Sequence, residues 1–230
     1  MNNKLNQHQP QFLQMSQGNG VQPRIKEMTY RHISIPLDGD IEDDLSLYRD
    51  CIEEIKEANQ GDVVSLILNT RGGSLKTALA IINAIQQTEA DTVAVIEGEA
   101  ASAGSLIAMH CQNVELNPYS TMFIHSESFG SAGKRSEVKS QVEFSLDWVE
   151  NVFRNSYYGF LTDEEMDKVL EGKDYYFNAE QILERLKQRQ AILQEEQKDC
   201  CDCEDCEEEQ EGSNYDEEFY GDTEMSLDSN

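Results

Sequence analysis

Residues 62–74 read DVVSLILNTRGGS, and this stretch decides the class of fold. The segment 62–69 is a nearly continuous apolar run of strand length, which is typical of strands buried on both faces of a sheet. Two adjacent glycines follow it, and apolar residues at a helical spacing lie along residues 74–87. A buried strand, a glycine turn and a helix in this order predict an α/β fold with parallel strands joined by helical crossovers.

The same alternation of strand and helix continues on both sides of this stretch. Short apolar runs predict further strands at residues 32–36, 92–96 and 121–125. Helical periodicity predicts further helices at residues 43–58, 102–110 and 136–156, of which the last is long and amphipathic. Two more helices are expected to begin at Thr162 and Asn178, because Glu165 and Gln181 follow them at the spacing of a capping box.

Composition divides the 230 residues into three parts. Residues 1–30 are rich in Asn and Gln, and we expect a disordered N-terminal arm. Residues 31–197 carry the folded patterning and are predicted to form one domain. Residues 198–230 are acidic and contain a cysteine cluster, and we expect a disordered tail.

The net charge of −27 argues against several classes of function. Sequence-independent binding to nucleic acid or to anionic membranes requires clustered Lys and Arg, so neither partner is expected. No apolar run reaches the roughly 18 residues of a membrane span, and the first residues lack the apolar core of a signal peptide. Four of the six cysteines crowd into residues 200–206, unlike the framework of a secreted disulfide-rich protein. We therefore expect a cytoplasmic protein.

The cysteine cluster at residues 200–206 allows two interpretations. Four thiolates so close together could bind Zn²⁺ or Cu⁺. No histidine accompanies them, and the neighbouring carboxylates disfavour the thiolate form, which favours a flexible reduced tail. We expect no bound metal and no cofactor.

Two glycine-bearing turns are candidates for a functional site, because each joins a buried strand to a helix. One contains Gly72 and Gly73, and the other runs from Gly98 to Gly104. Backbone N–H groups that point outward at such turns can hold an anion or an oxyanion. The alternative is tight turn geometry alone, and neither turn is a dinucleotide-binding or Walker A motif.

Ser102 starts a predicted helix after a buried strand, where a serine serves as a helix N-cap or as a nucleophile. A nucleophilic serine needs a base, and the chain has four histidines. His8 lies in the polar arm, His32 begins the first strand, and His110 lies about 12 Å away at the far end of the same helix. His125 lies at the carboxyl end of a strand, where the sites of parallel sheets are found. Geometry therefore favours His125.

An orienting carboxylate for His125 is harder to choose among 45 acidic residues. Asp174 precedes the aromatic pair Tyr175-Tyr176, in what we expect to be a loop before a helix. Apolar surroundings strengthen a hydrogen bond to an imidazole. The alternative is a solvated surface charge, and the pattern alone leaves both open.

Four motifs taken together resemble the Clp protease proteolytic subunit, a self-compartmentalising serine peptidase. They are Asn69-Thr-Arg-Gly72-Gly73-Ser74, Gly98-Glu-Ala-Ala-Ser102-Ala-Gly104, Met122-Phe-Ile-His125 and Asp174-Tyr-Tyr-Phe-Asn-Ala-Glu180. The similarity covers roughly residues 30–185. The chain order of serine, histidine and aspartate differs from that of α/β-hydrolases, chymotrypsin and subtilisin.

The resemblance implies a role for each matching residue. Ser102 would be the nucleophile, His125 the general base and then acid, and Asp174 the group that orients the imidazole. The N–H groups of Gly73 and Ala103 would form the oxyanion hole. The reaction implied is hydrolysis of peptide bonds through an acyl-enzyme.

The resemblance also implies an architecture and partners. The family's fold is the crotonase-like β-β-α superhelix, and the helix at 136–156 resembles the handle that packs two rings face to face. Heptameric rings would enclose a chamber for peptide or protein substrates, and a Clp-type ATPase unfoldase would be a partner.

The chain departs from the family at four places, and one is that the family's N-terminal axial loop has no clear match in residues 1–30. Arg71 stands where the family has Pro, residues 126–133 differ from the strand that helps to pair the rings, and residues 182–193 continue as helix where the family turns. These departures and the tails suggest a viral or phage-borne copy. Two alternative functions stay open: a crotonase-type acyl-CoA enzyme, and a catalytically inactive ring or scaffold subunit.

Overall fold

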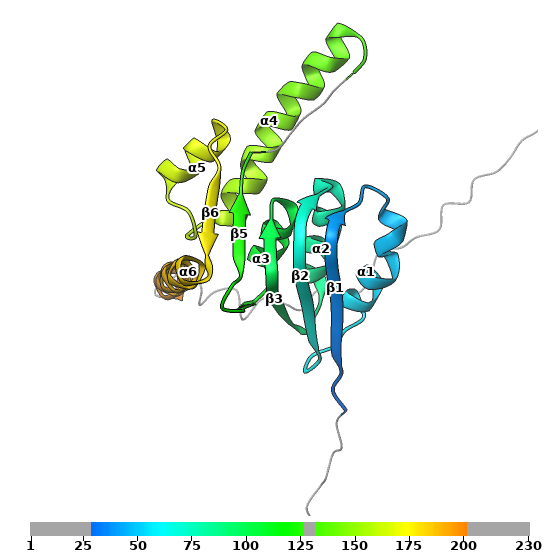
Figure 1. Ribbon diagram of the computed structural model, residues 1–230, viewed down its shortest axis with the longest axis vertical. Helices are drawn as coiled ribbons and strands as arrows, with labels where there is room; N and C mark the ends of the chain where they lie inside the picture. Colours follow the sequence, from blue (N-terminus) through cyan, green and yellow to red (C-terminus); the bar gives the residue numbers. More distant parts are fainter. Residues whose placement is uncertain (1–28, 127–131, 202–230) are drawn as a thin grey trace, which may run out of the picture.

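In the computed structural model, which describes residues 29–126 and 132–201, six strands form one mixed sheet (Figure 1). Neighbouring strands follow the order β1-β2-β3-β5-β6, and β4 pairs with β3 off this path. The strands are β1 (His32–Ile41), β2 (Val63–Gly73), β3 (Asp91–Ala101), β4 (Asn113–Leu116), β5 (Thr121–Ile124) and β6 (Tyr175–Asn178). The helices are the 3₁₀ helix η1 (Leu45–Tyr48), α1 (Arg49–Lys56), α2 (Leu75–Gln87), α3 (Ala103–His110), α4 (Arg135–Tyr157), α5 (Asp163–Leu170) and α6 (Ala179–Cys201).

The α/β architecture and each predicted strand and helix are confirmed, with corrections at three places. The helix predicted at 43–58 is divided into η1 and α1. Strand β4 was not predicted, and neither was β6, which occupies part of the expected loop after Asp174. The predicted parallel pairing is confirmed for β1, β2, β3 and β5, whereas the additional strand β6 runs antiparallel to β5.

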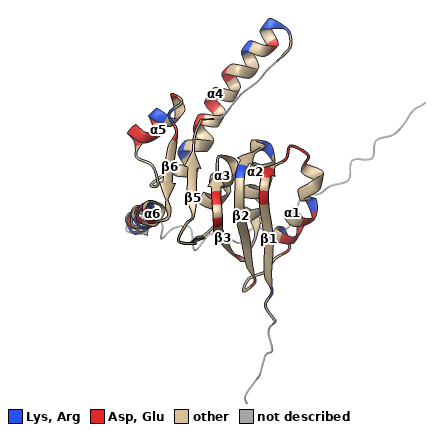
Figure 2. Cartoon of the chain, in the orientation of Figure 1, with Lys and Arg blue, Asp and Glu red and all other residues tan. Residues whose placement is uncertain are grey.

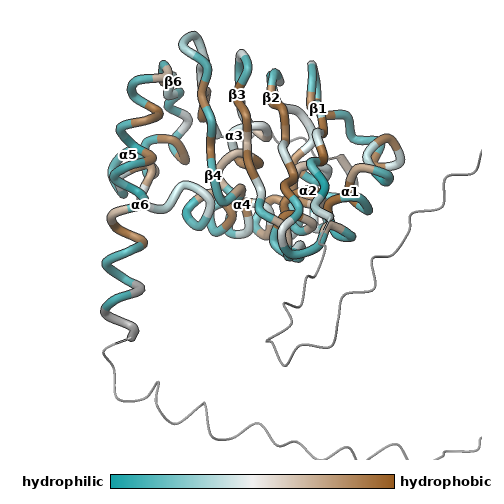
Figure 3. Tube along the Cα trace, turned by 90° about the horizontal axis from the view of Figure 1, so that it is seen from below, coloured by the Kyte–Doolittle hydropathy of each residue, from teal (hydrophilic) through white to brown (hydrophobic). Residues whose placement is uncertain are grey.

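The helices cover one face of the sheet, as the end-on view in Figure 3 shows. Val64, Leu66 and Leu68 of β2 are fully buried and belong to one core with Ile82 of α2 and Ile107 of α3. Alternate residues of β2 and β3 on the opposite face are only half-buried, including Ile67, Val93 and Val95. The expected burial of these strands on both faces is therefore wrong for the described chain.

Two long helices extend beyond this layered body. The base of α4 is buried through Val149, Phe153 and Tyr157, whereas its outer part projects from the sheet (Figure 1). Phe144 and Leu146 on that outer part are 67% and 64% exposed. Helix α6 begins at the predicted capping residue Asn178, whose side chain accepts from the Gln181 N–H at 2.9 Å.

The long helices α4 and α6 carry charged residues of both signs. Figure 2 shows Lys and Arg interspersed with Asp and Glu along α4 and α6. No helix of the described chain combines the length and the apolar composition that a membrane crossing requires. The predicted N-terminal arm up to residue 28, the acidic tail from residue 202 and residues 127–131 lie outside the described residues.

Candidate active site

Ser102 lies at the sharp turn between β3 and α3, and its backbone is strained. Its φ of +52° and ψ of −120° make it the one non-glycine residue with positive φ in the described chain. Such a conformation costs on the order of 1–3 kcal/mol and persists only where neighbours hold it. The Ser102 N–H donates to the Phe123 carbonyl at 2.8 Å, and its own carbonyl accepts from the Ser105 N–H at 2.9 Å.

The side chain of Ser102 does not cap helix α3. No side-chain capping hydrogen bond is made from this position, although the residue occupies the N-cap. The predicted N-cap position is therefore confirmed, but the serine side chain does not make the capping hydrogen bond. The Ser102 hydroxyl therefore caps no N–H of the first turn of α3, and the residue is half-buried.

The Gly72–Gly73 turn presses against Ser102. A Cβ atom on Gly72 would lie 2.7 Å from Ser102 Cβ and 2.9 Å from the Ala103 nitrogen, closer than side chains tolerate. Gly72 and Gly73 have φ values of +88° and +142°, which favour glycine. The two segments that carry the predicted oxyanion donors, Gly73 and Ala103, thus lie side by side.

The first N–H groups of a helix have no intrahelical acceptor, and this applies to Ala103 as the first residue of α3. The helix dipole places partial positive charge at the same terminus. Backbone N–H groups beside a serine hydroxyl are the arrangement that stabilises a tetrahedral oxyanion.

Strand pairing brings His125 and Asp174 to the same end of the sheet as Ser102. Ala101 of β3 pairs with Phe123 of β5, so Ser102 follows one position beyond this pair. Ile124 of β5 pairs with Tyr175 of β6. His125 directly follows Ile124, and Asp174 directly precedes Tyr175. In an antiparallel ladder these two positions face each other.

The strand register brings the three positions to the same end of the sheet, but their side chains are not joined as a triad. Within the described chain, no hydrogen bond connects Ser102, His125 and Asp174. The His125 ring instead stacks on Phe123, with ring centroids 4.8 Å apart and planes inclined by 10°. Phe123 in turn stacks on Tyr176 at 4.2 Å.

Phe123 and Tyr176 were missed as parts of the site. Phe123 lies two residues before His125, and Tyr176 lies two residues after Asp174. Residues two apart in a strand share a face, so this spacing is the signal that could have found them. The pairing of Phe123 with Tyr176 across β5 and β6 then completes the row of rings.

The other described histidines are hydrogen-bonded to serines elsewhere. His110 Nε2 lies 2.9 Å from Ser156 Oγ, between α3 and α4. Burial, and secondarily the nearby Arg189 charge, hold the pKa of His110 below its usual value. His32 Nε2 lies 2.7 Å from Ser65 Oγ on the sheet. His8 lies outside the described residues.

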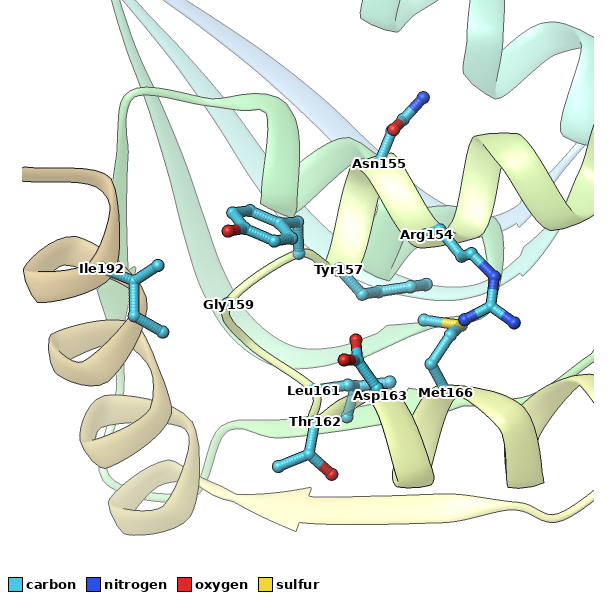
Figure 4. Close-up of a pocket in the computed structure, with 10 residues that line it drawn as sticks. Arg154, Asn155, Tyr157, Gly159, Leu161, Thr162, Asp163, Met166 and Ile192 are labelled. Atoms are coloured by element: carbon cyan, nitrogen blue, oxygen red, sulfur yellow. The ribbon is translucent and has the colours of Figure 1, made fainter. Parts of the chain in front are cut away.

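Two cavities lie near the C-terminal half of the chain. One of about 460 Å³ lies between the end of α4, the start of α5 and Ile192 of α6, and no predicted catalytic residue lines it (Figure 4). The second, of about 410 Å³, lies beside the row of rings. Its lining residues are Glu99, Thr121, Met122, Phe123, Tyr176, Phe177, Asn178 and Gln181.

The described residues contain no cluster of three or more side chains of the types that ligate metals. Helix α6 ends at Cys201, and the cysteine cluster continues beyond the described chain. The expectation of a reduced, metal-free tail is therefore untested.

Comparison with known proteins found a matching family model and a similar protein. The family model described as NfeD1b, N-terminal domain, matches residues 32–156, which is just over half of the chain. A relative in Tropheryma whipplei (strain Twist), the ATP-dependent Clp protease proteolytic subunit 2, is 28% identical over 125 residues. This alignment covers 53% of the chain and 68% of the relative. It supports a distant relationship to Clp protease subunits. The family match includes Ser102 and His125 and ends before Asp174.

Proposed function

Because the chain belongs to the family of the NfeD1b N-terminal domain, we propose that it is a serine endopeptidase related to the Clp protease proteolytic subunit. Ser102 is the nucleophile, His125 the general base, and Asp174 orients the imidazole. The N–H groups of Gly73 and Ala103 form the oxyanion hole. No metal and no cofactor takes part.

One observation carries this proposal: the strained Ser102 backbone beside the Gly72–Gly73 turn. A strand-to-helix turn that forces a positive φ on serine is unfavourable for stability, and glycine or asparagine would occupy it at lower cost. A reactive hydroxyl explains serine at this position. The glycine pair explains why backbone N–H groups can approach the reacting carbonyl closely.

The reaction proceeds through an acyl-enzyme. Ser102 Oγ attacks the scissile carbonyl carbon while its proton passes to His125, and the carbonyl oxygen becomes an oxyanion. Each oxyanion donor typically contributes about 3–4 kcal/mol of transition-state stabilisation. His125 then protonates the leaving amine as the carbon–nitrogen bond breaks, and a water molecule hydrolyses the ester with His125 as base.

Formation of the triad requires side-chain rotation. The His125 ring must turn from its stack on Phe123 towards Ser102 and Asp174. Catalytic hydrogen bonds are often long in unbound enzymes and tighten in the complex with substrate. Assembly of the full oligomer is the event to which we assign this rotation.

The chain assembles through its long helix α4 in this proposal. Phe144 and Trp148 stack on the projecting part of α4 with ring centroids 6.4 Å apart, and Leu146 is also exposed. A second copy would cover these groups, as the handle helices of Clp protease subunits do. We further propose a crotonase-like superhelix, heptameric rings that enclose a chamber, peptide or protein substrates and a Clp-type ATPase partner, in the cytoplasm.

The test is covalent labelling of the full chain with a fluorophosphonate. We expect modification of Ser102, read by peptide mass spectrometry, and loss of labelling and of peptide cleavage in Ser102→Ala. Ser65→Ala and Ser156→Ala are matched controls, because each removes a serine that is hydrogen-bonded to a histidine. Labelling of Ser65 or Ser156 in place of Ser102 would contradict the assignment.

A second candidate function is an inactive scaffold subunit. The absence of hydrogen bonds among the three predicted catalytic side chains in the described chain favours it. Intact oligomers that neither react with the fluorophosphonate nor cleave any peptide would establish the scaffold. Saturable binding of acyl-CoA would instead identify a crotonase-type enzyme.

A further inference from the structure

We infer that Thr70 is a positioning residue that fixes the two oxyanion donors relative to each other. This inference rests on the proposed peptidase function. Thr70 lies near the end of β2, is 1% exposed, and contacts three backbone segments that meet at the candidate site.

The Thr70 hydroxyl group links two of these segments. Thr70 Oγ1 donates to the Gly39 carbonyl at 2.6 Å and accepts from the Gly72 N–H at 3.0 Å. Gly39 lies at an irregularity in the β1–β2 ladder, where the register shifts. The hydroxyl therefore holds the start of the glycine turn to strand β1, at a point where regular strand pairing is interrupted.

The methyl group of Thr70 contacts the third segment, which is the first turn of α3. A Cβ atom on Gly104 would lie 2.4 Å from Thr70 Cγ2, so the first turn of α3 rests directly on this methyl group. Gly104 follows Ala103, one of the two proposed oxyanion donors. The same side chain thus contacts the residue after Ala103 and the residue before Gly73.

This arrangement assigns the Gly72 N–H a structural role. Because it donates to Thr70, the Gly72 N–H is not directed at a substrate oxygen. Neither glycine has a side chain of its own to fix the peptide plane between them, so their contacts with Ser102 and with strand β1 hold it. Without the Thr70 hydroxyl the Gly72 N–H loses its acceptor, and we expect the Gly73 N–H to shift with the segment.

Thr70→Val tests the hydroxyl, because valine retains the shape of the side chain and loses both hydrogen bonds. We expect kcat to fall roughly 10- to 100-fold with KM unchanged within about 2-fold, since only the transition state uses the hole. Binding of a peptide boronate, which forms a tetrahedral adduct with a nucleophilic serine, should weaken by the same factor as kcat. Thr70→Ser keeps the hydroxyl and should retain kcat within about 3-fold.

Thr92→Val is the matched control for stability. Thr92 is also 1% exposed in a strand, and its hydroxyl accepts the Gln112 N–H at 3.0 Å, away from the site. We expect both valine variants to lower the thermal unfolding midpoint by similar amounts, and only Thr70→Val to lose turnover. Equal losses of turnover in both variants would show a general structural effect and overturn the inference.

A compensating pair of variants tests the methyl contact even if Thr70→Val fails to fold. Gly104→Ala places a Cβ against Thr70 Cγ2 and should lower kcat, whereas adding Thr70→Ser removes that methyl group and should restore it. If kcat of the double variant is no higher than that of Gly104→Ala alone, the contact with the Thr70 methyl group is not the cause of the loss.

The failure of this inference is distinct from the failure of the proposed function. If the native chain reacts with the fluorophosphonate and Thr70→Val matches its kcat and boronate affinity, only the role of Thr70 is wrong. If the native chain does not react at Ser102, the peptidase itself is wrong, and the inference falls with it.

Discussion

The carboxyl ends of the strands and the helical layer behind them each carry a serine and a histidine, and the two pairs differ in their hydrogen bonds. In the helical layer, Ser156 Oγ donates to the Val152 carbonyl at 2.7 Å and lies 2.9 Å from His110 Nε2. His110 Nδ1 lies 3.2 Å from Gln86 Nε2. Each polar atom there already has a partner, so the serine proton is committed to the helix backbone.

At the carboxyl ends of the strands, the Ser102 side chain has no such hydrogen bond to the helix backbone. Ser102 makes no capping bond, its backbone is strained, and Gly72 lies against it. A short serine–histidine hydrogen bond by itself is thus compatible with a stable, packed helix interface. An uncommitted hydroxyl beside backbone N–H donors is what acyl transfer requires.

The largest difference between the two regions should appear when each histidine is replaced. We expect His125→Gln to lower kcat/KM by about 10⁴-fold or more, because proton transfer to and from Ser102 is lost. His110→Gln should change kcat/KM by less than about 3-fold. Steady-state hydrolysis of a fluorogenic peptide measures both, and a larger loss in His110→Gln would reverse the assignment.

Replacement of Asp174 tests the part of the site outside the family match. Asp174→Asn should lower kcat by about 10²- to 10⁴-fold with little change in KM, because the imidazole loses its orientation and its charge partner. Asp163→Asn, at the first residue of α5, is the control and should leave kcat unchanged. A kcat for Asp174→Asn equal to that of the control would remove Asp174 from the site.

Substitutions in the helical layer should lower the stability of the fold, whereas substitutions at the candidate site should lower turnover. Arg185 binds Glu165 with contacts of 2.6 and 2.8 Å, and also donates to the Phe160 carbonyl at 2.8 Å. Only 23% and 20% of the two side chains are exposed. Arg185→Met should lower the free energy of unfolding by about 2–3 kcal/mol, because it leaves the half-buried Glu165 carboxylate without its cationic partner and with the Thr162 N–H as its remaining donor.

Arg189→Met is the comparison for Arg185→Met. Arg189 is also half-buried on α6, and its contacts in the described chain are the Ser156 carbonyl at 3.0 Å and Met109 Sδ at 3.1 Å, with no carboxylate. We expect a change below about 1.5 kcal/mol. Urea unfolding measures both variants, and equal losses would show that the Glu165 pairing is not the cause.

The smallest expected effect is a pH dependence of stability from His110. Burial, then the Arg189 charge, lower the pKa of His110 in the folded state, so the unfolded state takes up a proton first as the pH falls. This contribution to stability is complete above the unfolded value near 6.5 and is lost as the pH falls through the lower folded value. His110→Gln should flatten the stability curve across that window, and an unchanged slope would contradict the assignment.

Local signals account for much of the fold. Thr162 and Glu165 form the predicted capping box, with the Glu165 N–H donating to Thr162 Oγ1 at 3.2 Å. Helix α4 begins and ends within one residue of its predicted bounds. These features depend on residues within a few positions of each other, so the sequence alone is enough to predict them.

Pairing between distant segments was harder to predict. Strand β6 has four residues, and within residues 29–126 and 132–201 its one partner strand is β5, which lies some fifty positions earlier in the chain. Its sequence, YYFN, is too short to separate a strand from a loop by periodicity. Without β6, the sequence offered no strand register to relate the positions of Asp174 and His125.

The amino-acid sequence by itself determined the alternation of strands and helices, because hydrophobic spacing and capping residues act over one or two turns of chain. It also singled out Ser102 and His125, since both follow apolar strands. Only the tertiary structure decided which face of the sheet the helices cover, which acid lies opposite His125, and how Gly72 and Thr70 meet the start of α3. Those contacts join segments far apart in the chain, and their geometry depends on strand register and close packing, which no local pattern encodes.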